Sequence, residues 1–175
     1  MLREYALSPR VFDPAAYASA REFKSVMGQL YRELQRHGLV RNLRDGAWLA
    51  QFNTPNFRQN LIARKIVEAL EKRKRLIPAG CYLPAAPRDD REWTEEALLG
   101  HDRKKAFGII ATHDTAAFFP AGKIVAAATA LDDAAWWNGR SDTATIGRAV
   151  ENYLATFRPV FRYSRSLVFV DPYLD

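Results

Sequence analysis

The chain has 175 residues, 48% of them hydrophobic and 12% aromatic, which is the composition of a folded protein with a sizeable core. Its single cysteine, Cys81, excludes an internal disulfide and a cysteine-rich zinc site. The longest apolar run, residues 124–131, is far shorter than the roughly 18 residues that a membrane span needs. Residues 1–10 alternate charged and apolar side chains, unlike a secretory signal. We therefore expect a cytoplasmic protein with no membrane partner, and nothing in the sequence indicates a cofactor.

Charge is distributed unevenly along the chain. Residues 1–88 carry sixteen Lys or Arg against seven Asp or Glu, a net charge of +9. Residues 89–175 carry ten against thirteen, a net charge of −3. A polyanionic partner is therefore expected to bind the front half.

The front half of the chain predicts three helices. Asp13 and Pro14 are a typical helix start, and apolar residues at every third or fourth position predict a helix over residues 14–37. A shorter helix is predicted over residues 45–52, and a third over residues 56–75. The first helix is expected to bury Ala20, Phe23, Met27, Leu30 and Leu34.

The third predicted helix is rich in cations, with only Glu68 and Glu71 against them. Clustered Lys and Arg neutralise phosphates and release counterions, which drives nucleic-acid binding without sequence preference. Three helices in a row also fit a helix-turn-helix or winged-helix arrangement. The alternative is a solvated helix end, because cations also favour a helix C-terminus. The candidate nucleic-acid-binding residues are Arg58, Arg64, Lys65, Lys72, Arg73, Lys74 and Arg75.

Residues 78–87 hold three prolines and Gly80, which predicts a linker at the point where the charge changes sign. Behind it the sequence alternates helical and strand-like patterns, which favours an α/β unit with parallel strands. The predicted order is a helix over 91–99, a strand over 106–112, one helical turn over 115–119, a strand over 123–129, a helix over 142–157 and a strand over 166–170.

The expected fold is therefore a mixed α+β or α/β protein. A basic N-terminal helical bundle over residues 1–77 would pack on a small α/β unit over residues 88–175. The bundle could have a winged-helix-like arrangement. The last strand has apolar residues on both faces and so needs neighbours on both sides. Either it lies between earlier strands, or the α/β unit is the front of a longer domain.

Polar residues follow two of the predicted strands. His113 and Asp114 come directly after the strand over 106–112, and Asp171 follows the strand over 166–170. Ligands of open α/β sheets bind at the carboxyl ends of the strands, so these three residues are a candidate catalytic site for proton transfer or a divalent metal. The acidic pair Asp132–Asp133 could join them. Each also has a structural alternative, because Asp114 can cap a helix and Asp171-Pro172 can form a turn.

A pair of tryptophans, Trp136 and Trp137, lies near Arg140 in a predicted loop. Aromatic rings beside a cation can stack a nucleic-acid base. The alternative is that both rings close the hydrophobic core.

The end of the chain carries the sequence LVFVDPYL, residues 167–174. It resembles the opening strand of phospholipase D-like domains, a family of nucleases, lipid-processing enzymes and non-catalytic binding proteins. The family's catalytic signature, His-x-Lys followed four residues later by Asp, is absent after His37, His101 and His113. The resemblance thus implies either chemistry beyond Asp175 or an inactive domain.

The leading interpretation is a nucleic-acid-associated accessory or regulatory module that binds the phosphate backbone through its basic helix. One alternative is a metal-assisted hydrolase that uses His113, Asp114 and Asp171. The other is a protein-interaction subunit of a larger complex.

Overall fold

The computed structural model describes residues 2–58, 60–119, 124–140 and 146–163. The chain forms two compact units, one of residues 3–140 and one that combines residues 1–2 with residues 141–175. The candidate Asp171, the strand predicted over 166–170 and the LVFVDPYL segment lie outside the described residues.

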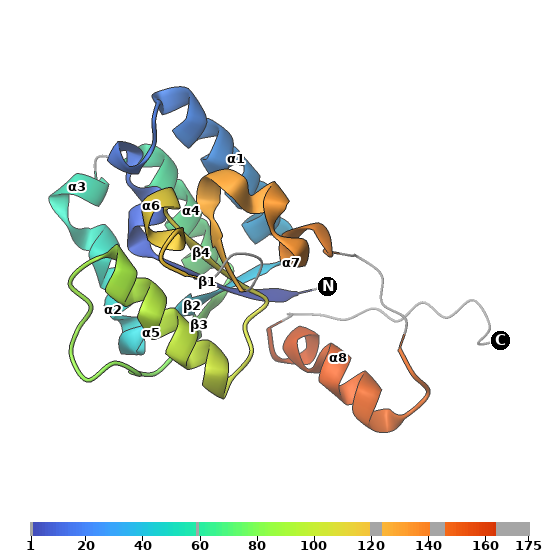
Figure 1. The fold of residues 1–175 in the computed structure, drawn as a ribbon. Helices are drawn as coiled ribbons and strands as arrows, with labels where there is room; N and C mark the ends of the chain where they lie inside the picture. Colours follow the sequence, from blue (N-terminus) through green and yellow to red (C-terminus); the bar gives the residue numbers. More distant parts are fainter. Residues whose placement is uncertain (1, 59, 120–123, 141–145, 164–175) are drawn as a thin grey trace. The chain divides into compact units, whose positions relative to one another are not determined.

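The unit of residues 3–140 is built on a five-stranded parallel sheet (Figure 1). Its strand order is β3-β2-β1-β4-β5. The central strand β1 therefore has as one of its neighbours β4, which is far from it in the sequence. All four residues of β4 are buried, as expected for a strand covered on both faces. The strands are β1 (Arg3–Leu7), β2 (Gly38–Asn42), β3 (Leu76–Pro78), β4 (Gly108–Ala111) and β5 (Val125–Ala127).

Helices cover both faces of this sheet. Successive residues of β1 point to opposite faces, so their partners identify the helix on each side. Tyr5 donates a hydrogen bond of 2.7 Å to Glu33 of α1 (Ala20–Arg36). Its neighbour Glu4 accepts one of 2.9 Å from Lys104, which follows α5 (Asp90–Arg103). Since α4 (Leu61–Lys72) packs beside α1, these two helices cover one face and α5 covers the other, which makes the fold a doubly wound α/β sheet.

The helix predicted over residues 14–37 is shorter than expected. Asp13 and Pro14 start only a 3-10 turn, η2 (Pro14–Ala16), where the Asp13 side chain accepts from Ala15 N. The helix proper begins after Ser19, whose Oγ accepts from Glu22 N at 3.1 Å, so Ser19 and not Asp13 is its N-cap. At the other end, the helix ends at Arg36, and β2 begins two residues later at Gly38.

The front half is not a separate helical bundle. The range 1–77 holds β1, β2 and all but the last residue of β3, and β1 pairs with both β2 and β4, so the sheet runs across the predicted linker. The predicted boundary at residues 78–87 therefore falls inside one unit. The smaller elements of the front half are η1 (Pro9–Phe12), η3 (Arg44–Gly46), α2 (Ala47–Ala50), η4 (Gln51–Asn53) and α3 (Pro55–Arg58).

The back half keeps most of the predicted order. Strands β4 and β5 fall within the two predicted ranges, and α5 continues past Gly100, where an end was expected. The remaining elements of this half are α6 (His113–Ala116), η5 (Ala128–Asp133) and α7 (Ala135–Asn138), with α8 (Val150–Tyr163) in the smaller unit.

Of the two tryptophans, Trp137 belongs to the core, and Trp136 is partly buried and packs against it. Trp137 is buried in α7, and Trp136 packs so closely on β4 that a Cβ at Gly108 would lie 2.2 Å from its ring. Only glycine leaves room for this approach. Arg140 lies over the Trp137 ring at 3.5 Å, so the cation expected near the pair covers a buried ring. The core alternative is the correct one for Trp137.

Candidate functional site

The strand order creates a switch point between β1 and β4. From β1 the chain winds outward through β2 to β3, and α5 then carries it back across the sheet to β4. In open α/β sheets of this kind, ligands bind outside the carboxyl ends of the strands at the point where the winding reverses. The residues that follow β1 and β4 therefore form the first candidate site.

A chain of hydrogen bonds connects these residues to the start of α5. The backbone N–H of Ser8, directly after β1, donates to the carbonyl of Ile110 in β4 at 3.0 Å. Two residues further on, the hydroxyl of Thr112 donates to Oδ2 of Asp90, the first residue of α5, at 2.7 Å. Ser8, Thr112 and Asp90 are all buried. The switch point thus has a buried polar floor made from three different elements.

Two atoms of this floor have no hydrogen-bond partner in the structure. They are Oγ of Ser8 and Oδ1 of Asp90. Leaving a buried polar group unsatisfied costs about 1–3 kcal/mol, so such atoms need an explanation. The two other buried side-chain atoms without a partner among the described residues are the indole nitrogens of Trp136 and Trp137.

Tyr17 lies close to the same acidic group. Its hydroxyl donates to the Val11 carbonyl at 2.5 Å. Burial raises the pKa of Tyr17 well above its usual value, and the negative charges of Glu22, Asp90 and Asp13 raise it further. The phenol therefore stays protonated and acts as a hydrogen-bond donor at every physiological pH.

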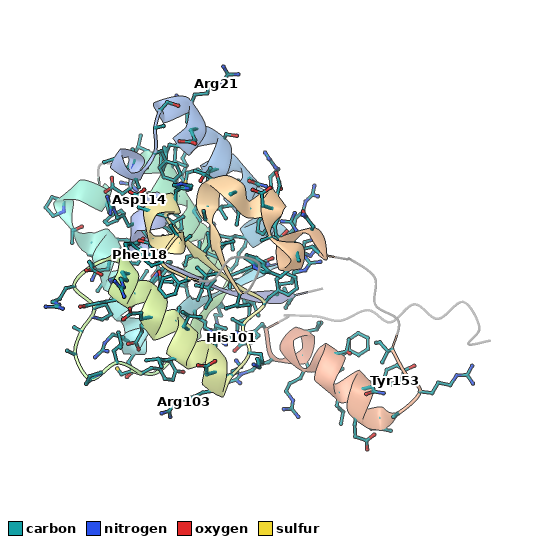
Figure 2. All side chains as sticks on the ribbon, in the orientation of Figure 1. Arg21, His101, Arg103, Asp114, Phe118 and Tyr153 are labelled. Atoms are coloured by element: carbon teal, nitrogen blue, oxygen red, sulfur yellow. The ribbon has the colours of Figure 1, made fainter. Side chains whose placement is uncertain are left out.

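The predicted residues His113 and Asp114 are found at the switch point. They form the first turn of α6, immediately after Thr112, and both are exposed. Figure 2 shows Asp114 and Phe118 at one end of α5, with His101 and Arg103 at the other end. Asp132 and Asp133 follow β5 in η5, and Asp132 accepts a hydrogen bond from Gln29 of α1 at 3.1 Å.

Metal binding gains no support from this geometry. In the ranges that the structure describes, no group of three or more His, Cys, Asp or Glu side chains is arranged to hold a metal ion. Whether Asp171 joins His113 and Asp114 stays a prediction, because Asp171 lies outside those ranges.

The second candidate site is the basic face formed by α1 and α4. Together, α1 and residues 61–75 carry ten Lys or Arg against four Asp or Glu, a net charge of +6 that equals the charge of the whole chain. On the opposite face, α5 and the two residues after it carry four cations against five acids, a net charge of −1, and α5 alone has a net charge of −3. The uneven charge of the sequence therefore becomes a difference between the two faces of one sheet.

The cations of this face are not equivalent. Lys65 and Lys72 are exposed, lie seven residues apart on α4 and so point to the same side. Arg64 forms an exposed pair with Glu68 at 3.0 Å. Lys74, also exposed, lies in the turn after α4 with a positive φ of 55°.

The two arginines after α4 bind the end of α1. Arg73 donates to the carbonyl of Gln35 at 2.9 Å, and Arg75 donates to those of Leu34 and Gly38 at 3.4 and 3.3 Å. Burial and the neighbouring Arg73 charge lower the pKa of Arg75. Carbonyl groups do not cancel a formal charge, so these residues hold α1 and α4 together while they add to the positive field.

Arg58 does not belong to the helix that carries the other candidates. The predicted helix over 56–75 is broken: Arg58 ends α3, and α4 starts after Asn60. Asn60 is the N-cap of α4, since its Oδ1 accepts from Ala63 N at 3.1 Å, and its amide group donates to the Phe12 carbonyl at 2.6 Å. The seven-residue spacing from Arg58 to Lys65 therefore does not place both on one helix face.

Three arginines of the front half form ion pairs inside the protein instead. Each forms an ion pair with a glutamate that is at most slightly exposed: Arg3–Glu33 at 3.1 Å, Arg41–Glu4 at 2.6 Å and Arg44–Glu96 at 3.1 Å. A count of charges along the sequence includes them, but they add nothing to a binding surface.

The comparisons with known proteins give no further guide. No protein-family model, no curated protein and no solved structure matches the chain. Among the described residues, no helix is long and apolar enough to cross a membrane.

Proposed function

We propose that the protein binds nucleic acid through its phosphate backbone on the face formed by α1 and α4. The observation that carries the proposal is the net charge of +6 on this face beside the negative charge of α5. Such a field attracts a polyanion to one side of the molecule, and its release of counterions supplies affinity without reading sequence.

The strip of contact runs along the boundary between the two helices. Lys65 and Lys72 flank it on α4, and Lys24 lies on the exposed side of α1. Tyr31, two turns after Lys24, is 40% exposed and offers an aromatic surface to an unpaired base. On its other side α1 meets η5 and Asp132, which limits the positive strip to the α4 side.

Binding is expected to be weak and strongly dependent on salt. About three or four phosphate contacts predict a micromolar or weaker dissociation constant, and a loss of affinity of roughly 40- to 150-fold between about 50 and 200 mM salt. Fluorescence anisotropy with unrelated DNA and RNA oligonucleotides at both salt concentrations measures this directly. Absence of binding at the lower salt concentration would end the proposal.

A charge-reversal pair locates the surface. Changing Lys65 and Lys72 together to Glu should weaken binding by about tenfold or more at low salt. The matched control reverses two exposed cations, Arg103 at the end of α5 and Lys105 two residues after it, and so changes the net charge equally. If both double variants lose the same affinity, net charge and not the α1–α4 face drives binding.

A second candidate function is hydrolysis at the carboxyl edge of the sheet. The observation that favours it is the exposed pair His113 and Asp114 on the first turn of α6, next to the bond between Thr112 and the buried Asp90. An imidazole with carboxylates nearby is suited to general acid–base catalysis, and Asp171 is proposed as a third member.

Cleavage of labelled single-stranded RNA and DNA, with Mg²⁺ or Mn²⁺ and with EDTA, tests this candidate. We expect His113→Ala to reduce cleavage by 10²-fold or more, on the order of a lost general acid or base, with no change in the thermal midpoint. Equal cleavage by the wild type and this variant would exclude the role of His113.

A further inference from the structure

The buried floor of the switch point holds two polar atoms that the fold itself does not use. Ser8 is 2% exposed and Asp90 is 6% exposed, yet Oγ of Ser8 and Oδ1 of Asp90 have no hydrogen-bond partner. They come from two elements that pack together, because Ser8 leads into η1 and η1 contacts the α5 helix that Asp90 begins. Both residues are bonded to the end of β4, because Ser8 N donates to Ile110 and the Asp90 carboxylate accepts from Thr112, two residues further on.

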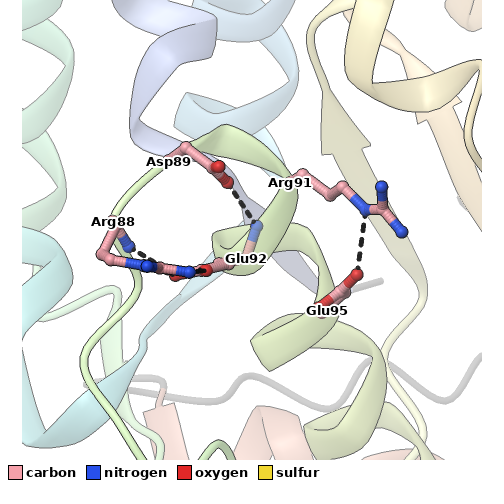
Figure 3. A network of polar contacts seen from close by, with 5 residues as sticks. All are labelled: Arg88, Asp89, Arg91, Glu92 and Glu95. Atoms are coloured by element: carbon pink, nitrogen blue, oxygen red, sulfur yellow. Dashed lines mark hydrogen bonds and ion pairs between the residues drawn. The ribbon is translucent and has the colours of Figure 1, made fainter.

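Helix capping does not explain either group. At the start of α5 the N-cap is Asp89, whose Oδ1 accepts from Glu92 N at 2.9 Å (Figure 3). The carboxylate of Asp90 is therefore free of that role. Ser8 precedes η1 in the capping position, but its side chain makes no capping hydrogen bond. Protein atoms alone leave one acceptor and one hydroxyl unsatisfied, and buried polar groups in proteins normally have partners.

The chemistry of the two atoms selects the missing partner. A carboxylate oxygen can only accept a hydrogen bond, whereas a serine hydroxyl can donate and accept. A ligand hydroxyl satisfies both at once, since it can donate to Asp90 while it accepts from Ser8. This is the way in which acidic residues bind sugar hydroxyls at the strand ends of nucleotide-binding sheets.

Cations at the rim favour an anionic group on the same ligand. Arg10 lies two residues after Ser8 in η1, and Arg91 follows Asp90 in α5; both are exposed. Arg91 pairs with Glu95 at 3.1 Å (Figure 3) and lies 5.0 Å from the ring centre of Phe118, which is 65% exposed. Arginine is well suited to binding phosphate, because its planar guanidinium can donate two parallel hydrogen bonds to phosphate oxygens.

From this arrangement we infer that Ser8, Asp90 and Thr112 form a binding site for the sugar hydroxyl of a sugar phosphate, with Arg10 and Arg91 on the phosphate side. The inference does not depend on the binding of nucleic acid to the α1–α4 face. Entry requires a local opening, because both atoms are closed to water. The adjacent α6 has only four residues and no side-chain cap, so it can move at the cost of few hydrogen bonds.

The test measures the thermal midpoint and the heat of binding of the full chain with defined probes. Ribose 5-phosphate and adenosine monophosphate should each raise the midpoint, by about 3–6 °C at roughly ten times the dissociation constant. Free ribose and inorganic phosphate should each shift it less. An equal shift with inorganic phosphate alone would reveal only an anion site, and a shift with Mg²⁺ alone that Asp90→Asn abolishes would reveal a cation site; either result overturns the inference.

Two variants and one control assign the site to these residues. Asp90→Asn puts a donor where an acceptor is needed, and Ser8→Ala removes the hydroxyl, so each should weaken sugar phosphate binding by about tenfold or more. Ser8→Ala should leave the midpoint of the unliganded protein unchanged or raised, because it removes an unsatisfied buried group. The Lys65→Glu/Lys72→Glu variant should bind sugar phosphate normally, which separates this site from the nucleic-acid face. If neither probe shifts the midpoint, or if Ser8→Ala binds it as the wild type does, the inference is wrong.

Discussion

Replacing Glu96 by alanine is expected to lower the free energy of unfolding by about 3–5 kcal/mol, the usual cost of removing one partner from a buried ion pair. The Glu96 side chain is fully buried in α5 and accepts three hydrogen bonds. They come from Arg44 at 3.1 Å, from Tyr82 N at 2.6 Å and from Leu83 N at 2.8 Å. The alanine variant would leave a mostly buried guanidinium without its carboxylate, although Arg44 still donates to the Leu83 carbonyl, and would leave two backbone N–H groups unsatisfied. Urea unfolding measures the loss.

Two further variants separate charge from packing. Glu96→Gln keeps the shape and one carbonyl oxygen, so it should cost less, about 1–3 kcal/mol. Arg91→Ala on the same helix breaks an exposed pair with Glu95 and should cost less than about 1 kcal/mol. A loss for Glu96→Ala as small as that for Arg91→Ala would contradict the buried position of Glu96.

This contact also explains why the predicted linker is part of the fold. Tyr82 and Leu83 lie in the proline-rich range 78–87, which reads as a flexible connection in the sequence. In the structure their N–H groups bind Glu96, and the carbonyls of Ala79 and Gly80 accept from Asp45 N and Arg44 N. The hydrogen-bonded partners are up to 52 residues apart in the sequence, so a local sequence pattern cannot predict these contacts.

The strands of the front half were not predicted from the sequence, because they are short and carry charged residues whose partners are distant in the sequence. β1 begins Arg3-Glu4, which looks exposed, yet Arg3 is buried by its ion pair with Glu33, and Glu4 binds Arg41 and Lys104. β3 is only three residues long. Long amphipathic helices such as α1 and α4 give a repeated signal, while a short strand with paired charges gives almost none.

At the candidate site, too, some residues could be predicted from the local sequence and others could not. His113 and Asp114 could be placed at a strand end because residues 108–111 form a plainly apolar run. Ser8 and Asp90 could not, because their importance depends on the pairing of β1 with β4 and on the bond from Thr112 to Asp90. The one available signal was the order of the elements, which would have required β1 to be recognised first.

The charge pattern was informative, but its meaning changed with the fold. A basic front half predicted a basic domain, whereas the sheet distributes the same residues over two faces and an interior. The charge difference between the α1–α4 face and α5 remains in the structure. Arg3, Arg41 and Arg44, in contrast, neutralise glutamates that are buried or nearly so. Surface charge should therefore be counted by helix and face, not by position in the sequence.

Truncating Leu30 to alanine is expected to cost about 2–5 kcal/mol of unfolding free energy, because a buried leucine loses its transfer energy and leaves a cavity. The helical spacing predicted Leu30 and Leu34 as core positions, and the structure confirms both: they are 0% and 2% exposed. The matched control is Arg32→Ala, an exposed position on the same helix, which should change stability by no more than about 0.5 kcal/mol. Chemical denaturation of the three proteins gives the comparison. A loss below about 1 kcal/mol for Leu30→Ala would mean that α1 presents a different side to the sheet, and the Tyr5–Glu33 hydrogen bond and the basic strip beside α4 would then have to be reassigned as well.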